Sequence, residues 1–284
     1  MLESLGAVRC LSDDFDVVER VQQERQLVAG EFLVVDKKRG EDVTFDGFFS
    51  HAHPYLRLSV ASVLGRIDLN ETAIALFAKA PRAGFVKTRL TAAISGEDAA
   101  EFHRNCVLEV WDKLRRACDA KVFLYSDIAD AAWRELAGAE KFRLQRGADL
   151  GRKMLCCLDE LLGAGYRDAL IVGSDSPTLP VGYIDDAVRA LETSDVVLGP
   201  SEDGGYYLIG ARRTKQSMFA GVSWSDEQTR TRTIRAVEAA GLDVTEVGEW
   251  YDVDQPADLE RLRLDPALSP RLRKWFEDSA ARLQ

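Results

Sequence analysis

The fold of this chain is indicated by the run Ile74-Ala75-Leu76-Phe77-Ala78 and the loop that follows it, Lys79-Ala80-Pro81-Arg82-Ala83-Gly84-Phe85-Val86-Lys87-Thr88-Arg89-Leu90. The first run is apolar throughout, which is typical of a strand buried on both faces. Between residues 72 and 96 there are four basic residues and no acidic one. Because ligands of open α/β sheets bind beyond the carboxyl ends of strands, this loop is a candidate ligand-binding segment.

The same alternation of elements continues toward the C-terminus. Short apolar runs at 122–125, 169–173 and 196–198 indicate further buried strands. Between and after them, apolar residues at helical spacing predict helices over 97–118, 127–137, 150–162, 183–191 and 231–240, the last ended by Gly241. Alternating strands and helices predict an α/β fold with a mainly parallel central sheet covered on both faces.

Composition narrows the functional classes. The 284 residues are 46% hydrophobic and 30% charged, which excludes collagen-like and disordered chains. The formal net charge of −10 argues against non-specific binding to nucleic acid or anionic lipid. Apolar runs are short and Met1 is followed by acidic and polar residues, so we expect neither a signal peptide nor a membrane span. Five cysteines without a CxxC pattern favour the cytoplasm.

Residues 1–70 differ from the rest, and we treat them as an N-terminal extension of unknown role before a domain at 71–284. The polar segment 19–26 could be helical, the run 32–35 is β-rich, and residues 37–46 are charged and turn-like. His51 and His53 would share one face of an extended segment. Two imidazoles make an incomplete zinc site, so histidines in a surface loop are the favoured interpretation.

The basic loop has the residue types that bind phosphate. Pro81 and Gly84 shape it, and Gly84 lets backbone N–H groups approach a ligand. Lys87 and Arg89 supply a point charge and a planar fork for phosphate oxygens. A helix beginning near Val86 would add its positive end. The spacing is neither that of a Walker loop nor of a GxGxxG turn, and a solvated basic loop is the alternative.

Two later motifs supply carboxylates. Asp175, in the segment 173–180, leaves a buried strand and suits a hard divalent cation, with a helix cap as the alternative. Asp252 and Asp254 would share one face of a strand, and Pro256 would open the following helix. Magnesium usually takes one or two protein carboxylates, so Asp175 and one late aspartate would suffice.

A further motif, at 199–210, places paired glycines after Asp203. The glycines could form a hairpin turn and nothing else, because Asp-Gly is a strong turn signal. Alternatively they let a substrate lie against the backbone, with Asp203 and Tyr206 as polar contacts.

Taken in order, these motifs resemble the glycosyltransferase A-fold superfamily of nucleotide-diphospho-sugar transferases. They are most similar to the bacterial arsenosugar-biosynthesis glycosyltransferase-like family, with its K-x-P-x-x-G-x-V-K-T-R-L, G-x-D-x-P-x-L, E-D-G-G-Y-Y and D-x-D-x-P-x-D-L signatures. The resemblance runs from about residue 72 to 263. The basic loop is also similar to that of 2-phospholactate guanylyltransferases, and the implied fold is shared with molybdenum-cofactor guanylyltransferases. The chain lacks the Gly-rich Arg-Met loop of many sugar-nucleotide pyrophosphorylases, which argues against that assignment.

The resemblance implies a three-layer α/β/α Rossmann-like glycosyltransferase A fold and a set of site residues. The residues implied to bind the nucleotide are Lys79, Pro81, Gly84, Lys87, Arg89, Asp149 and Asp175. Those implied for the acceptor are Asp203, Gly204, Gly205, Tyr206 and Trp224, although Trp224 could equally belong to the core. The implied metal ligands are Asp175 and Asp254, with Asp252 as the alternative to Asp254. The implied catalytic residues are Lys87, Arg89, Asp175 and Asp203.

The resulting hypothesis is a transferase, dependent on Mg²⁺ or Mn²⁺, that moves a sugar from a nucleotide-diphospho-sugar to a small-molecule acceptor. One alternative is a guanylyltransferase-like nucleotidyltransferase that joins a nucleoside triphosphate to a phosphorylated small molecule and releases pyrophosphate. A second alternative is a catalytically silent nucleotide-binding protein. We expect no nucleic-acid or membrane partner, and a homodimer is one option for the oligomeric state.

Overall fold

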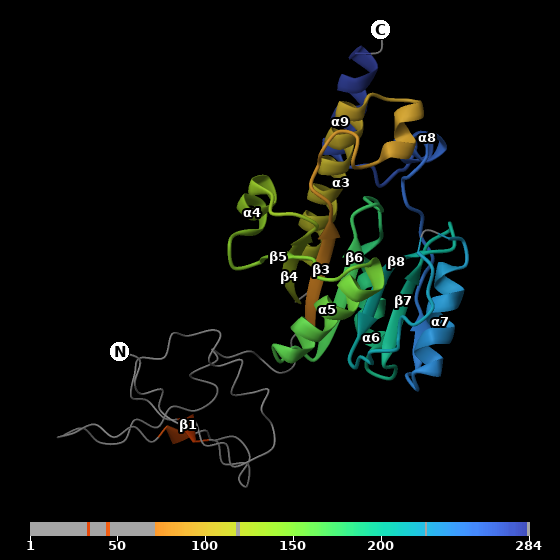
Figure 1. Cartoon of the computed structure of the whole chain (residues 1–284). Coiled ribbons are helices and arrows are strands. Elements are labelled where there is room, and N and C mark those ends of the chain that lie inside the picture. The colour runs from red at the N-terminus through yellow and green to blue at the C-terminus, as the bar shows by residue number, and fades with distance from the viewer. Residues whose placement is uncertain (1–32, 35–43, 46–71, 118–119, 225, 283–284) are drawn as a thin grey trace, which may run out of the picture. The chain divides into compact units, whose positions relative to one another are not determined.

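The computed structural model describes residues 33–34, 44–45, 72–117, 120–224 and 226–282 (Figure 1). The chain divides into two compact units, Met1–Asp68 and Leu69–Gln284. In the first unit, β1 (Leu33–Val34) pairs antiparallel with β2 (Thr44–Phe45). The first of these strands agrees with the β-rich run, whereas the second lies where the sequence predicts a turn. The predicted helix at 19–26 and the pair His51 and His53 lie outside the described residues.

The second unit contains a seven-stranded sheet in the order β5-β4-β3-β6-β8-β7-β9. Its strands are β3 (Thr72–Ala78), β4 (Ala120–Ser126), β5 (Phe142–Leu144), β6 (Asp168–Gly173), β7 (Val196–Pro200), β8 (Tyr206–Ala211) and β9 (Val244–Glu246). Neighbouring strands are parallel except at β8, which runs antiparallel to both β6 and β7. The sheet is therefore mainly parallel, as the alternation of elements predicts.

Helices cover both faces of this sheet. The helices of the second unit are η1 (Thr88–Ala92, a 3-10 helix), α3 (Gly96–Ala117), α4 (Ala131–Ala137), α5 (Leu150–Gly163), α6 (Val181–Ala190), α7 (Thr229–Ala239), α8 (Pro256–Arg263) and α9 (Pro270–Arg282). Ile74 and Leu76 of β3 pack on one face with residues of α3, α4 and α6. Ala73 and Ala75 pack on the other face with residues of α5 and α7, and Figure 1 shows α5 in front of the sheet. The three-layer α/β/α arrangement is confirmed.

A third buried cluster joins the loop after β3 to the C-terminal helices. It includes Leu90 of η1, Phe102 of α3, Trp275 of α9 and residues of α8. The ring centroids of Phe102 and Trp275 are 4.9 Å apart. Figure 1 shows α9 beside α3, at the end of the sheet where β3 terminates. This cluster anchors the end of the basic loop to α3 and the C-terminal helices.

Several element bounds differ from the predicted ones for local reasons. The helix predicted from residue 127 begins at Ala131, because the Asp130 carboxylate accepts a hydrogen bond from Trp133 N at 3.1 Å. The helix considered near Val86 is only the short 3-10 helix η1, which starts at Thr88. Strands β5, β8 and β9 and helix α9 were not predicted. Pro256 does open α8.

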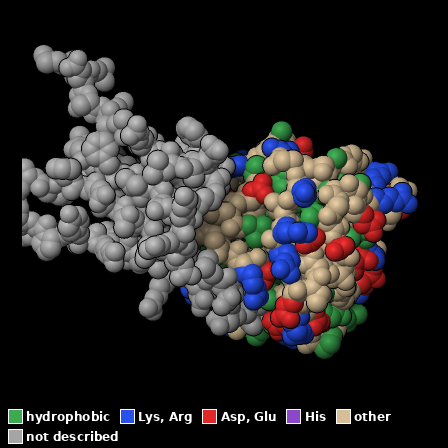
Figure 2. Space-filling view, turned by 90° about the horizontal axis from the view of Figure 1, so that it is seen from below, with side chains coloured by type: hydrophobic (Ala, Val, Ile, Leu, Met, Phe, Trp, Pro, Cys, Tyr) green, Lys and Arg blue, Asp and Glu red, His purple; other side chains and the backbone are tan. Residues whose placement is uncertain are grey.

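Charges of both signs lie side by side on the face of the second unit that Figure 2 shows. The formal net charge of −10 is thus not displayed as one continuous acidic surface on this face. Within the part of the chain that the structure describes, no helix combines the length and apolar character that crossing a bilayer requires.

Candidate active site

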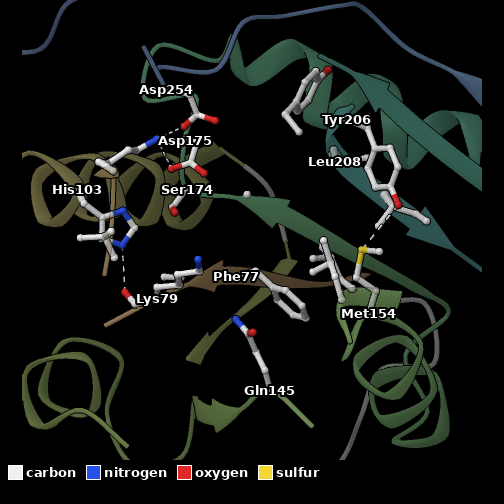
Figure 3. A pocket seen from close by; sticks show the side chains of 18 residues that line it. Phe77, Lys79, His103, Gln145, Met154, Ser174, Asp175, Tyr206, Leu208 and Asp254 are labelled. Atoms are coloured by element: carbon white, nitrogen blue, oxygen red, sulfur yellow. Dashed lines mark hydrogen bonds and ion pairs between the residues drawn. The ribbon is translucent and has the colours of Figure 1, made fainter. Parts of the chain in front are cut away.

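Two adjoining cavities lie in the second unit, and the first of them opens at the carboxyl ends of β3 and β6. The first cavity has a volume of about 430 Å³ and is lined by residues of both strand ends and of β8 (Figure 3). The second cavity, of about 750 Å³, lies against the turn between β7 and β8. The residues common to both walls are Leu150, Tyr206 and Asp254. The arrangement can therefore hold two ligands that meet at a shared boundary.

Lys87 connects the basic loop to two of the predicted carboxylates. Its Nζ lies 2.5 Å from Asp175 Oδ1 and 2.8 Å from Asp254 Oδ1, and it donates a hydrogen bond to Val253 O at 2.7 Å. The Lys87 side chain is 3% exposed, whereas those of Asp175 and Asp254 are 43% and 38% exposed. The structure thus brings three separate sequence motifs to one point.

The charges at this point shift one another's pKa values. Burial alone would lower the pKa of Lys87, but Asp175 and then Asp254 raise it well above its ordinary value. Burial alone would raise the pKa of Asp175, but the Lys87 ammonium lowers it below its ordinary value. Lys87 is therefore protonated and Asp175 ionised at neutral pH.

The backbone of Lys87 directs its side chain toward the carboxylates. Lys87 has φ 47° and ψ 37°, and it is the one non-glycine residue with positive φ among those the structure describes. This left-handed conformation costs about 1–3 kcal/mol. Val86 and Leu90 on either side are buried at 3% and 0% exposure, and their packing holds the turn.

The loop after β6 is fixed from several directions. Lys113 Nζ of α3 donates to Pro177 O at 2.5 Å and to Leu179 O at 3.3 Å. The Thr178 hydroxyl donates to the Tyr251 hydroxyl at 3.0 Å. The backbone of Asp175 itself is held, because its carbonyl accepts from Val253 N at 2.9 Å. These contacts set the position of the Asp175 carboxylate before any ligand binds.

Asp252 is held by hydroxyl groups. Its carboxylate accepts hydrogen bonds from Ser176 Oγ and, at 2.7 Å, from Ser201 Oγ. Burial, and then the charge on Asp175, raises the pKa of Asp252 to about 6. Asp252 and Asp254 lie outside any strand, so the strand in which they would share one face is absent. Of the two, Asp254 contacts the Lys87 ammonium.

The peptide at Lys79 is rigid and places the exposed Lys79 side chain in the wall of the first cavity. The Lys79 carbonyl accepts from His103 Nε2 and from Trp133 Nε1, each at 3.0 Å, and Ala80 N donates to Asp127 Oδ1 at 2.7 Å. Because a carbonyl only accepts, Nε2 of His103 carries the hydrogen and Nδ1 is an acceptor. Within the described structure, Nδ1 is buried without a hydrogen-bond partner. Burial is the main cause of the lowered pKa of His103.

Asp203 and the two glycines form the turn of the β7–β8 hairpin, which confirms the hairpin interpretation. Gly205 N donates to Asp203 Oδ1 at 2.9 Å. Gly204 has φ +86°, and a Cβ there would lie 2.0 Å from the backbone oxygen of Glu227. Asp203, both glycines and Tyr206 also line the second cavity. The turn is thus both a structural element and a cavity wall.

Trp224 is both packed and cavity-lining. Its ring lies 5.9 Å from that of Phe219, and a Cβ added to Gly151 would come within 2.6 Å of its Cζ2. It nevertheless borders the second cavity. Its neighbour Ser225 lies outside the described residues.

The second cavity is rich in acidic groups. It is lined by one cationic residue, Arg89, and by Glu202, Asp203, Asp226, Glu227, Asp252 and Asp254. Glu202 pairs with Arg261, Asp226 with Arg232 and Asp254 with Lys87. Asp203, Glu227 and Asp252 form no ion pair with another described residue, and neither does Arg89. The cavity wall therefore carries a net negative charge.

The remaining predicted nucleotide residues do not line the first cavity. Pro81 and Gly84 belong to the loop beyond Lys79, where Gly84 has φ +79°. Asp149 caps α5 by accepting from Arg152 N at 2.9 Å, and its neighbour Leu150 lines both cavities. Arg89 lies in the second cavity, not the first.

Some cavity residues carry no motif that could single them out. Gln145 follows the three-residue strand β5, and Met154 lies one helical turn after Leu150 on α5. His103 and Lys113 are both on α3, one in the wall and one behind the loop. For Met154, the apolar helical spacing was a usable signal, but it predicts core as readily as cavity wall.

The chemistry of the carboxylates fits a hard divalent cation. No group of three His, Cys, Asp or Glu side chains among the described residues is arranged to enclose a metal. However, Mg²⁺ usually binds through one or two carboxylates and takes its other ligands from water and phosphate. Asp175 and Asp254 converge on one point and remain about 40% exposed to the cavities. They are a donor pair of this kind.

This chain is similar in sequence and fold to known proteins. Residues 111–226 match a family model described as "Uncharacterized protein conserved in bacteria (DUF2064)". A crystal structure described as a "putative nucleotide-diphospho-sugar transferase" from Desulfovibrio desulfuricans is 30% identical, with a TM-score of 0.65, and the match covers 75% of this chain and 98% of that one. This chain belongs to the nucleotide-diphospho-sugar transferase-like superfamily.

A curated relative of this transferase-like protein is the 3-phospho-D-glycerate guanylyltransferase of Phenylobacterium zucineum. It is 28% identical over 219 residues, which are 73% of this chain and 90% of the relative. The segment that matches the family model, residues 111–226, includes Asp175 and the Asp203 turn. It begins after Lys87 and ends before Asp254.

Proposed function

We propose that this superfamily member is a transferase that binds a nucleotide-diphospho-sugar in the first cavity and transfers the sugar to a small acceptor in the second. The observation that carries the proposal is the junction of the two cavities at Asp254, beside Lys87 and Asp175. A diphosphate at this junction would lie next to the acceptor. Bringing two reactants together in a fixed orientation is a large part of the catalysis of group transfer.

The first cavity supplies what a nucleotide needs. Phe77, Leu150 and Met154 form an apolar wall for the base or sugar, and Lys79 offers an exposed ammonium to phosphate. Gln145 donates from Nε2 to Tyr125 O at 3.0 Å, which leaves its Oε1 to accept a hydrogen bond from the ligand. An apolar wall with a few placed polar groups is typical of small-molecule sites.

In this proposal Asp175 and Asp254 would hold Mg²⁺ or Mn²⁺, which when bound would neutralise charge on the leaving diphosphate. Arg89 would contact diphosphate oxygens from the second cavity, where its guanidinium has no carboxylate partner among the described residues. Asp203 uses Oδ1 for Gly205 N, so Oδ2 would accept from the acceptor hydroxyl and orient it. Removing one such electrostatic contact should cost about 3 kcal/mol of activation free energy.

The charge of the second cavity favours sugar transfer to an acceptor without a phosphate group. Asp203 and Glu227 form no ion pair with a described cation, and the cavity offers a single guanidinium, that of Arg89. A phosphorylated acceptor would lie against these carboxylates and be repelled, whereas a neutral hydroxyl compound would gain hydrogen-bond acceptors.

The second candidate is nucleotidyl transfer, and the curated relative is the observation that favours it. That relative is a 3-phospho-D-glycerate guanylyltransferase, and its match covers 73% of this chain. In this alternative a nucleoside triphosphate would occupy the first cavity, and the acceptor phosphate would attack its α-phosphorus with release of pyrophosphate.

One experiment separates the candidates. The full chain is incubated with a panel of nucleotide sugars or nucleoside triphosphates. Each donor is tested with a pool of neutral acceptors and with a pool of phosphorylated acceptors, and each mixture contains Mg²⁺, Mn²⁺ or EDTA. Release of nucleoside diphosphate from a nucleotide sugar would support the proposal, and release of pyrophosphate would support nucleotidyl transfer. Nucleotide binding in a thermal-shift assay without turnover of any donor would contradict both.

A further inference from the structure

The Lys87 ammonium is fully occupied by protein oxygens. An ammonium has three N–H donors. In Lys87 they meet Asp175 Oδ1, Asp254 Oδ1 and Val253 O at 2.5, 2.8 and 2.7 Å. With 3% of its side chain exposed, Lys87 does not offer its charge to a phosphate group in this arrangement. It serves instead as the counter-charge of the two carboxylates (Figure 3).

This arrangement affects any divalent cation at the same carboxylates. A metal between the two Oδ1 atoms would take the place of the ammonium. A metal on their outer oxygens would lie within a few ångströms of a positive charge, and such repulsion is large where solvent is partly excluded. In either position, Lys87 and the metal compete for the same pair of charges.

We propose that Lys87 is an internal counter-cation that competes with the divalent metal for Asp175 and Asp254, so that the metal binds tightly only when the ammonium has moved away. The inference rests on the proposed function in placing a metal at these carboxylates. Lys87 lines the first cavity, where phosphate oxygens would be alternative partners for it. Because coupling between two ligands is reciprocal, nucleotide phosphates would then strengthen metal binding and metal would strengthen nucleotide binding.

The backbone of Lys87 suits such a change of partner. Its left-handed conformation, with φ 47°, is held by the burial of Val86 and Leu90. The contacts of the ammonium with Asp175, Asp254 and Val253 offset part of the cost of this left-handed backbone. If the ammonium left the carboxylates, that offset would be lost. Thr88 and Arg89, which follow Lys87, are exposed.

The first test measures Mn²⁺ binding to the full chain by electron paramagnetic resonance, without nucleotide. Lys87→Gln keeps two N–H donors and removes the charge, and we expect it to bind Mn²⁺ at least about tenfold more tightly than the wild type. The matched control is Lys79→Gln, in the same cavity wall but without an ion pair to either carboxylate, and it should change the affinity less than about threefold. Equal or weaker Mn²⁺ binding by Lys87→Gln would overturn the proposal.

The second test uses the wild-type chain and does not depend on the folding of a variant. Lysines are acylated with a short N-hydroxysuccinimide ester, with and without saturating Mn²⁺, and the extent of modification is read by mass spectrometry. We expect Lys87 to be protected without Mn²⁺ and several-fold more reactive with it, while Lys79 is reactive in both. Unchanged protection of Lys87 at saturating Mn²⁺ contradicts the proposal.

Absence of Mn²⁺ binding at these carboxylates in both the wild type and Lys87→Gln would also overturn it. That outcome is distinguishable from failure of the proposed function, because turnover of a nucleotide donor is measured in a separate assay. Conversely, Mn²⁺ binding that is strengthened by Lys87→Gln supports the proposal even if no donor in the panel is turned over.

Discussion

Lys87 and Asp254 are 167 positions apart in the sequence, yet the Lys87 Nζ lies 2.8 Å from the Asp254 Oδ1. This contact joins the loop after the first strand of the sheet to the segment before α8. With Asp175 it creates a point where one positive and two negative charges meet at the border of two cavities. The predictions below test the elements that build this point and its surroundings.

Gly204 should be required for the turn that borders the second cavity. In Gly204→Ala, the left-handed backbone would cost about 1–2 kcal/mol. The new Cβ would also meet the Glu227 backbone oxygen, which lies 2.0 Å from its ideal position. We expect a loss of stability clearly larger than in Gly221→Ala, where φ is +74° but no atom lies within 4 Å. Urea unfolding measures both variants, and equal losses would show that the close approach is unimportant.

His103 should make stability fall as the pH falls. Burial lowers the pKa of His103 from its ordinary value of 6.5, with Asp175, Lys87 and Lys79 as the charged groups nearby. A base with a lowered folded-state pKa takes up a proton more readily when unfolded. Its contribution to stability is therefore complete above about pH 6.5 and is lost progressively as the pH falls through the lower folded-state pKa.

Chemical denaturation between pH 7.5 and 5 measures this effect. The free energy of unfolding of the wild type should decrease over this range more steeply than that of His103→Gln, which has no titrating ring. Parallel pH dependences for the two proteins would contradict the assignment of a buried neutral histidine.

Arg89 should act on the donor and not on the fold. Its side chain is exposed in the wall of the second cavity. We expect Arg89→Gln to lower kcat/KM for the nucleotide donor by about 100-fold, the scale of one lost charge-assisted contact to phosphate. Arg82→Gln is the control, because Arg82 is also exposed in the basic loop but stacks on Phe85, 4.4 Å from the ring centroid, outside both cavities. Similar kinetics for the two variants would remove Arg89 from the proposed mechanism.

Much of the fold follows from local sequence. The apolar runs around Ile74 and Leu170 predict buried strands because only strands covered on both faces are apolar at every position. Lys87 and Asp175 were found because they follow buried strands, and the carboxyl ends of parallel strands meet at one edge of a sheet. Asp254 was found by its motif alone, because it lies outside any strand. The order of strands and the reversal of β8 depend on long-range pairing that no local pattern records.

Other features could not be predicted for physical reasons. Tyr206–Ala211 is a strand only because it pairs with β6 and β7, while the glycines before it read as loop. A lysine in a basic loop suggests contact with phosphate, but the burial of Val86 and Leu90 turns Lys87 toward two carboxylates. His103 enters the wall because α3 passes behind Lys79, which its helical spacing alone does not reveal.

The central claim is that Asp175 and its partners form a metal-dependent nucleotide site. The most direct test is isothermal titration calorimetry of the donor identified in the panel, with Mg²⁺ or with EDTA. The titration is done on the wild type, on Asp175→Asn and on the surface control Asp186→Asn. Asp186 pairs with Arg189 on α6. We expect metal-dependent binding in the wild type and the control, and a loss of about 100-fold or more in affinity in Asp175→Asn. Equal, metal-independent affinity in all three proteins would contradict the account.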